Sequence, residues 1–178
     1  MTALDSRVVL APGDGSLGPL LRVTDDRLAP GAGYGRHDHR AVDVVAVVLS
    51  GSLEHRWGAG AVVSAGDVAV LRAGAGLAHD EVAGADGARV LQCYLRSAAP
   101  GEPAGHEVHR AAAGWIDLRR PDARLWVGPA AAGPPPGLAL AVGAAEVRLL
   151  ADGDAGAAGA GTVVVWQVDE ARPVWAEW

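Results

Sequence analysis

The sequence contains no phenylalanine, no lysine and no asparagine, and it has one cysteine, Cys93. A single cysteine excludes an internal disulfide and a cysteine-based zinc site. Cys93 lies in the apolar run 90–95, which predicts a buried strand thiol. All fifteen basic residues are arginines scattered along a chain of net charge −6, so we expect no nucleic-acid surface. Without phenylalanine, the core must depend on valine, leucine and the six tryptophans.

Long hydrophobic runs are missing as well. No apolar stretch approaches the roughly 20 residues that a membrane-spanning helix needs. Asp5 and Arg7 interrupt the N-terminal segment, and the apolar run 8–11 is too short for the core of a signal peptide. We therefore expect a soluble, cytoplasmic protein without a membrane partner, and we expect a monomer.

What the chain has in quantity is glycine and proline, 25 and 11 of its 178 residues. Short Val-rich runs alternate with glycine turns, and no segment shows a clear helical pattern. This spacing predicts an all-β protein, an antiparallel sandwich or barrel. The expected strands are 8–10, 20–23, 44–49, 52–56, 61–63, 68–71, 77–81, 89–95, 115–118, 124–127, 138–142, 146–150 and 162–168.

Several turns are expected between these strands. Ser50-Gly51 predicts a hairpin and residues 84–87 a second turn. Asp25-Asp26 and Pro30 predict a break, and residues 152–161 a Gly/Ala turn region. The segment 98–105 is rich in Ala, Pro and Gly and predicts a linker. We accordingly expect an N-terminal domain at 1–97 and a less regular C-terminal domain at 98–178. The lead-in 31–35 is expected to be flexible, with room for a close backbone approach to a bound group.

Two pairs of polar residues carry the chemistry. His37 and His39 are two residues apart, as are His79 and Glu81. In an extended strand, residues i and i+2 point to the same face, so each pair can reach one point. Three imidazoles and one carboxylate suit a divalent transition metal, which could be Fe(II), Ni(II), Cu(II), Zn(II), Co(II) or Mn(II). The sequence predicts that the fold brings the two pairs together on one ion.

Other polar residues have two interpretations each. His55 is either a core or surface histidine without a role at the site, or one that supports a metal ligand. Asp43 is either a fifth ligand or a residue that caps its strand or hydrogen-bonds a ligand imidazole. Trp57 either packs or lines the mouth of a pocket, and Asp80 should point away from the site. His106 and His109, beside the expected linker, are taken as surface histidines.

Four motifs occur in an order that resembles the pirin family of cupins, over about residues 20–97. They are Gly35-Arg-His-Asp-His-Arg40, Ser50-Gly-Ser-Leu-Glu-His-Arg56, Ala65-Gly-Asp-Val68 and Ala73-Gly-Ala-Gly-Leu-Ala-His-Asp-Glu81. The resemblance implies a cupin double-stranded β-helix (a jelly-roll barrel) in a bicupin whose C-terminal domain is reduced and metal-free. It also implies His37, His39, His79 and Glu81 as ligands, with Fe(II) favoured. The turn 57–60 is shorter than in most pirins, and this implies a reshaped pocket mouth.

For function, the resemblance implies a quercetin-type dioxygenase acting on a small aromatic enol such as a flavonol, with dioxygen. Glu81 would be the catalytic base, because it is the only carboxylate among the four expected ligands. Two alternatives remain: a non-catalytic metal-binding protein with a redox or regulatory role, and a metallocupin isomerase or cyclase that does not use oxygen.

Overall fold

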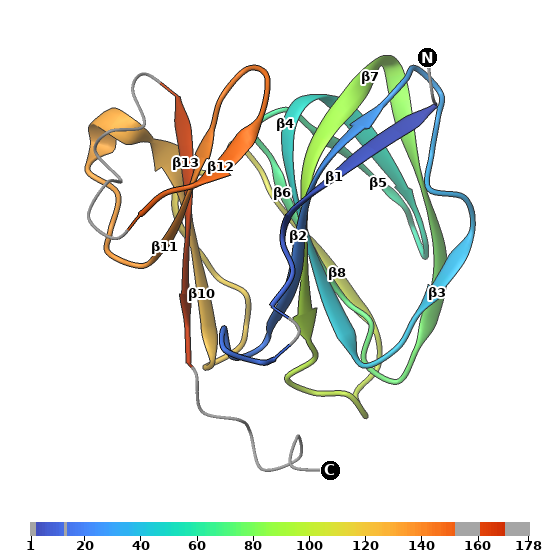
Figure 1. Ribbon diagram of the computed structural model, residues 1–178. Coiled ribbons are helices and arrows are strands. Elements are labelled where there is room, and N and C mark those ends of the chain that lie inside the picture. The colour runs from blue at the N-terminus through green and yellow to red at the C-terminus, as the bar shows by residue number, and fades with distance from the viewer. Residues whose placement is uncertain (1–2, 13, 152–160, 170–178) are drawn as a thin grey trace. The chain divides into compact units, whose positions relative to one another are not determined.

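The computed structural model describes residues 3–12, 14–151 and 161–169, and these residues form two β units (Figure 1). The first unit comprises residues 1–8 and 22–111, and the second comprises 9–21 and 112–178. The only helical segment in the described part of the chain is the 3-10 turn η1 (Ala130–Ala132). No helix in that part is long and apolar enough to cross a membrane. The predicted all-β cupin architecture is confirmed.

The first unit is built on an eight-stranded antiparallel sheet with the order β1-β2-β7-β4-β6-β8, in which β3 also pairs with β7 and β5 with β4. In Figure 1 these strands curl around a common interior. Val-rich, alternating segments bury one face inside it, around a cluster that includes Val48, Leu53 and Val90. The strands are β1 (Leu4–Leu10), β2 (Leu20–Leu28), β3 (His37–His39), β4 (Val42–Arg56), β5 (Ala61–Ser64), β6 (Val68–Arg72), β7 (Leu77–Arg96) and β8 (Gly105–His109).

The second unit contains one five-stranded sheet with the order β12-β11-β13-β10-β9. Its strands are β9 (Gly114–Ile116), β10 (Ala123–Pro129), β11 (Leu138–Val142), β12 (Val147–Leu149) and β13 (Thr162–Val168). Residues 163–166 of the central strand β13 are all buried, as the continuous apolar run predicts. One face packs Val163 and Val165 against Trp126 and Ala139. The predicted turn region 152–161 lies almost wholly outside the described residues.

The two predicted turns in the first unit are wrong, because β4 and β7 are each continuous. β4 runs for 15 residues through Ser50-Gly51, and β7 runs for 20 residues through 84–87. Their register shifts between Val48 and Ser50 and again between Gly51 and Leu53. These irregularities bend the paired strands instead of ending them. Gly51 has φ +68°, and a Cβ there would overlap the carbonyl oxygen of Gly87. Sequence patterns treat a glycine as the end of a strand. Here Gly51 instead permits a bend within a continuous strand.

The predicted break at Asp25-Asp26 is also wrong, because β2 continues to Leu28 with both carboxylates buried. Asp25 accepts two hydrogen bonds from Arg89, at 2.7 and 2.8 Å. Asp26 accepts one from Ser6 at 2.6 Å and one from Tyr34 at 2.9 Å. Burial raises the pKa of Asp26, and these hydrogen bonds oppose that effect. Buried acids with partners are compatible with a strand interior, and the partners are distant in sequence.

The expected domain boundary after residue 97 differs from the division of the chain that the structure shows. Strand β8, placed beyond the boundary, pairs with β6 from Val68↔His109 to Arg72↔Gly105. Residues 105–111 therefore belong to the first unit, and residues 9–21 belong to the second. The placement of β8 overturns the interpretation of His106 and His109 as surface residues, because both are half-buried within a strand.

Candidate metal centre

Strand pairing brings His37 and His79 opposite each other. In the antiparallel β3–β7 pair the register is His37↔His79 and His39↔Leu77. The lead-in also pairs with β7, because Tyr34 N–H donates to the Glu81 carbonyl oxygen at 3.1 Å. A Cβ on Gly33 would overlap that same oxygen. The glycine of the lead-in thus allows a close approach to the β7 backbone, whereas the sequence predicts a close approach to a bound group.

The three imidazoles converge on one point. Nε2 of His37 lies 3.0 Å from Nε2 of His39 and 3.0 Å from Nε2 of His79. The ligand nitrogens of all three residues lie within 4.8 Å of one another. Three of the four predicted ligands are therefore brought together across two strands about forty residues apart in sequence.

This spacing suits a transition metal. Metal–nitrogen bonds to histidine are about 2.0–2.1 Å long, so two such bonds at right angles put their nitrogens about 3.0 Å apart. The carbonyl oxygen of Gly35 lies 2.7 Å from His37 Nδ1 and can only accept, so Nδ1 carries the hydrogen. The Nε2 lone pair of His37 is then directed at the other two rings. The donor set fits a divalent ion held by three imidazoles.

Burial favours the neutral form of two of the three imidazoles, His39 and His79. His79 is fully buried, and desolvation lowers its pKa to about 4 against the opposing attraction of Glu81. Desolvation, with the neighbouring charge of His37, also lowers the pKa of His39. A neutral imidazole offers the free lone pair that coordination requires. The site is therefore ready to bind a metal at neutral pH without first releasing protons from these two rings.

Glu81, the fourth predicted ligand, is 2% exposed, and each of its carboxylate oxygens has a polar neighbour. His55 Nε2 lies 2.9 Å from Oε1, and Gln92 Nε2 donates to Oε2 at 3.2 Å. Burial raises the pKa of Glu81, but the hydrogen bond and charge of His55 outweigh it, so the pKa lies below its usual range. Glu81 is thus a carboxylate at neutral pH. Its ligation of the metal stays a prediction.

The remaining candidates are also placed. Asp43 is buried on β4 but is not among the side chains whose donor atoms converge. Asp80 lies opposite Arg56 in the β4–β7 register, and its Oδ1 accepts the Glu81 N–H at 2.9 Å. Trp57 packs on a cluster with Val44 and Leu71 and also lines a hollow of about 360 Å³. Its packing is confirmed, and its place at the mouth of the metal pocket stays a prediction.

Two residues near Glu81 were missed or left open by the sequence. Gln92 is fully buried within the apolar run 90–95. A single amide side chain in such a run is the feature by which the sequence could have identified it. His55 is buried as well, and its ring stacks on that of His106, with centroids 4.9 Å apart and planes 29° apart. His55 therefore contacts Glu81 on one side and His106 on the other.

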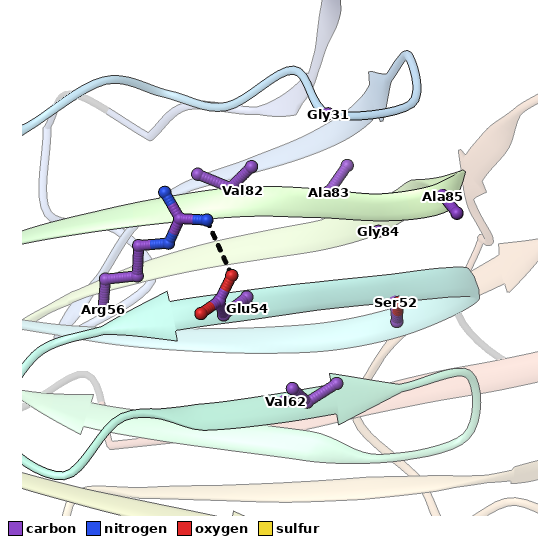
Figure 2. A pocket seen from close by; sticks show the side chains of 9 residues that line it. All are labelled: Gly31, Ser52, Glu54, Arg56, Val62, Val82, Ala83, Gly84 and Ala85. Atoms are coloured by element: carbon purple, nitrogen blue, oxygen red, sulfur yellow. Dashed lines mark hydrogen bonds and ion pairs between the residues drawn. The ribbon is translucent and has the colours of Figure 1, made fainter.

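A hollow of about 550 Å³ lies on β4, β5 and β7 away from the imidazoles (Figure 2). Its wall includes Ser52, Glu54 and Arg56, which alternate along β4 with the buried Leu53 and His55. Residues of opposite parity point to opposite faces of a strand, so this hollow is on the outer face. Figure 2 shows the side chains of Arg56 and Glu54, two residues apart on β4, joined by an ion pair; the N–O distance is 2.7 Å.

Fold and site together define an all-β cupin barrel with a cluster of three histidines that could bind a metal. The family described as Pirin matches residues 12–95, and these residues thus form a pirin-family domain. This domain carries all four predicted ligands.

Solved structures agree with this assignment of the fold. The bacterial pirin YhhW from Escherichia coli, solved in complex with nickel(II), is similar with a TM-score of 0.66 at 17% identity. The alignment covers 95% of this chain and 93% of that one. The protein GK1651 from Geobacillus kaustophilus is similar with a TM-score of 0.67 at 17% identity, over 98% and 93% of the two chains.

Among curated proteins, quercetin 2,3-dioxygenase from Escherichia coli K12 is 34% identical over 61 residues, which are 33% of this chain and 26% of that protein. Pirin-like protein 2 from Arabidopsis thaliana is 32% identical over 81 residues, 44% of this chain and 25% of that protein. The matched stretches cover only 25% to 34% of the length of the first curated relatives.

Proposed function

We propose that this protein is a metal-dependent dioxygenase of the pirin type, acting on a small aromatic enol such as a flavonol. The observation that carries the proposal is the position of a buried carboxylate, Glu81, two residues along β7 from one of three converging imidazoles. The similarity to a protein named quercetin 2,3-dioxygenase supports the substrate class.

The proposed roles follow from the contacts. His37, His39, His79 and Glu81 would hold one divalent ion, with Fe(II) the first candidate and Ni(II), Cu(II), Zn(II), Co(II) and Mn(II) the others. When bound, the ion supplies Lewis acidity that favours the deprotonated form of an enol hydroxyl. Glu81 accepts the hydroxyl proton at a carboxylate oxygen, because it is ionised at neutral pH. Its lowered pKa makes it a weak base, so the Lewis acidity of the ion is needed to make the hydroxyl acidic enough. Dioxygen would then add to the electron-rich ring of the deprotonated substrate, and ring carbon–carbon bonds would break. Both oxygen atoms end in the products, so no separate reductant is required.

The barrel interior supports this chemistry by excluding water. His79, Glu81, His55 and Gln92 are each at most 3% exposed. A weakly hydrated interior strengthens the interaction of the carboxylate with a substrate proton. The same burial protects a reactive enolate from unproductive protonation.

The test is the loss of flavonol absorbance when quercetin and oxygen are added to protein loaded with each candidate metal in turn. Glu81→Gln should retain metal and lose most turnover, about 10²–10⁴-fold for removal of a general base. Full activity in that variant would show that Glu81 is not the catalytic base. No loss of flavonol with any metal would favour a binding or regulatory role, and turnover of an enolisable substrate without oxygen would favour an isomerase or cyclase.

A further inference from the structure

Inside the barrel, three side chains from three strands form a continuous row beside the imidazole cluster. They are His106 on β8, His55 on β4 and Glu81 on β7. The rings of His106 and His55 stack, and His55 Nε2 meets Glu81 Oε1 at 2.9 Å. His55 and Glu81 are also directly opposite each other in the β4–β7 register, so backbone pairing helps to hold the two side chains together.

Glu81 needs such support. A carboxylate that is 2% exposed is strongly desolvated, and it stays in place only if its oxygens have partners. The two partners approach different oxygens, since His55 lies at Oε1 and Gln92 donates to Oε2. Two contacts on opposite oxygens define the rotation of the carboxylate about its Cγ–Cδ bond. A single contact would leave that rotation open.

His55 is itself restrained by His106. The His106 ring covers the face of His55 at 4.9 Å, and β8 is joined to the barrel through its pairing with β6. His106 Nε2 is buried and has no hydrogen-bond partner within the described residues. The ring thus contributes packing against His55 instead of a hydrogen bond.

We propose that His55 is a positioning residue that, together with Gln92, orients the Glu81 carboxylate toward the three-imidazole cluster, and that His106 holds His55 in place by stacking. This inference rests on the proposed role of Glu81 at the metal, but it concerns how the carboxylate is held. Partners that orient the groups around a metal change its affinity by about 10–100-fold when they are removed.

The test measures metal binding and needs no turnover. Co(II) affinity is measured by competition with a coloured chelator, and the visible spectrum of the Co(II) protein reports the environment of the ion. His55→Leu should weaken Co(II) binding by about tenfold or more and shift the spectrum toward that of Glu81→Gln. His55→Gln, whose amide can still donate to Oε1, should recover most of the affinity. His106→Phe, which preserves a stacked ring, should bind Co(II) as the unaltered protein does.

A double-mutant cycle separates positioning from a general structural role. If His55 acts through Glu81, His55→Leu should have no further effect on affinity or spectrum in a Glu81→Gln background. An equal effect in both backgrounds, or none in either, would overturn the proposal. Should His55→Leu fail to fold, His55→Asn supplies the same comparison, because its shorter amide does not reach Oε1. Unchanged Co(II) affinity in His55→Asn would likewise overturn the proposal. A failure of the unaltered protein to consume flavonols would count against the proposed function and not against this inference.

Discussion

His37 and His79 face each other directly across the β3–β7 pair, with their Nε2 atoms 3.0 Å apart. β3 has only three residues, so its pairing with β7 decides whether the two histidine motifs meet. The metal centre is therefore a property of strand register. A slip of one residue would turn His37 and His39 to the other face.

Replacing His37 should empty the site. His37→Ala removes the nitrogen that lies 3.0 Å from both other Nε2 atoms, so we expect loss of bound metal from freshly isolated protein. Elemental analysis measures the metal content. Asp38→Ala, an exposed neighbour on the same strand, is the matched control and should keep its metal. Equal metal content in the two variants would contradict a site at these imidazoles.

Acid should destabilise the metal-free protein through His106. Burial first, and then the nearby His55, lower the pKa of His106 to about 4, below the value of about 6.5 in an unfolded chain. Between these values the unfolded state binds more protons, so the free energy of unfolding falls as pH decreases from 6.5 to 4. One such group contributes at most about 1.4 kcal/mol per pH unit.

Urea titrations of the metal-free protein across pH 4–7 measure this effect. His106→Phe should show a smaller decline in stability with acid than the unaltered protein, because one depressed histidine has been removed. His39 and His79 also have lowered pKa values and should leave part of the decline in place. An identical slope in both proteins would show that His106 is not held neutral by the fold.

The buried pair Asp25–Arg89 should be important for stability. The two side chains are 3% and 8% exposed, and two hydrogen bonds join them. Arg89→Met leaves a buried carboxylate without this partner, so we expect a loss of about 3–5 kcal/mol in the free energy of unfolding. Arg56→Met breaks the half-exposed pair with Glu54, which water screens, and should cost far less. Urea denaturation compares the two, and equal losses would contradict this ranking.

Gly51 should resist substitution. Its φ of +68° is unfavourable for other residues, and a Cβ would also overlap the Gly87 carbonyl oxygen at the bend of β4 and β7. Gly51→Ala should therefore destabilise the protein by well over the roughly 1 kcal/mol that the left-handed conformation alone costs. Gly58→Ala is the control, since Gly58 has φ +58° with open space around its Cα. Thermal unfolding of both variants gives the difference, and similar shifts would mean that the bend can relax.

Much of the fold could be predicted from local pattern. The expected strands 138–142 and 162–168 match β11 and β13 residue for residue, because continuous apolar runs bounded by turn residues define their own ends. Where glycine or aspartate lies within a strand, the pattern fails. Gly51 serves a bend and Asp25 binds Arg89, and in each case the partner is far away in sequence.

The sequence by itself determined which atoms are available at the site. Period-two spacing places His37 with His39, and His79 with Glu81, on common strand faces whatever the rest of the fold does. Only the tertiary structure decided that the two pairs meet through the register of β3 on β7, that His55 and Gln92 contact the carboxylate, and that His106 stacks on His55. The reason is physical: side-chain direction within a strand is local, whereas the pairing of strands depends on the burial of the whole barrel core.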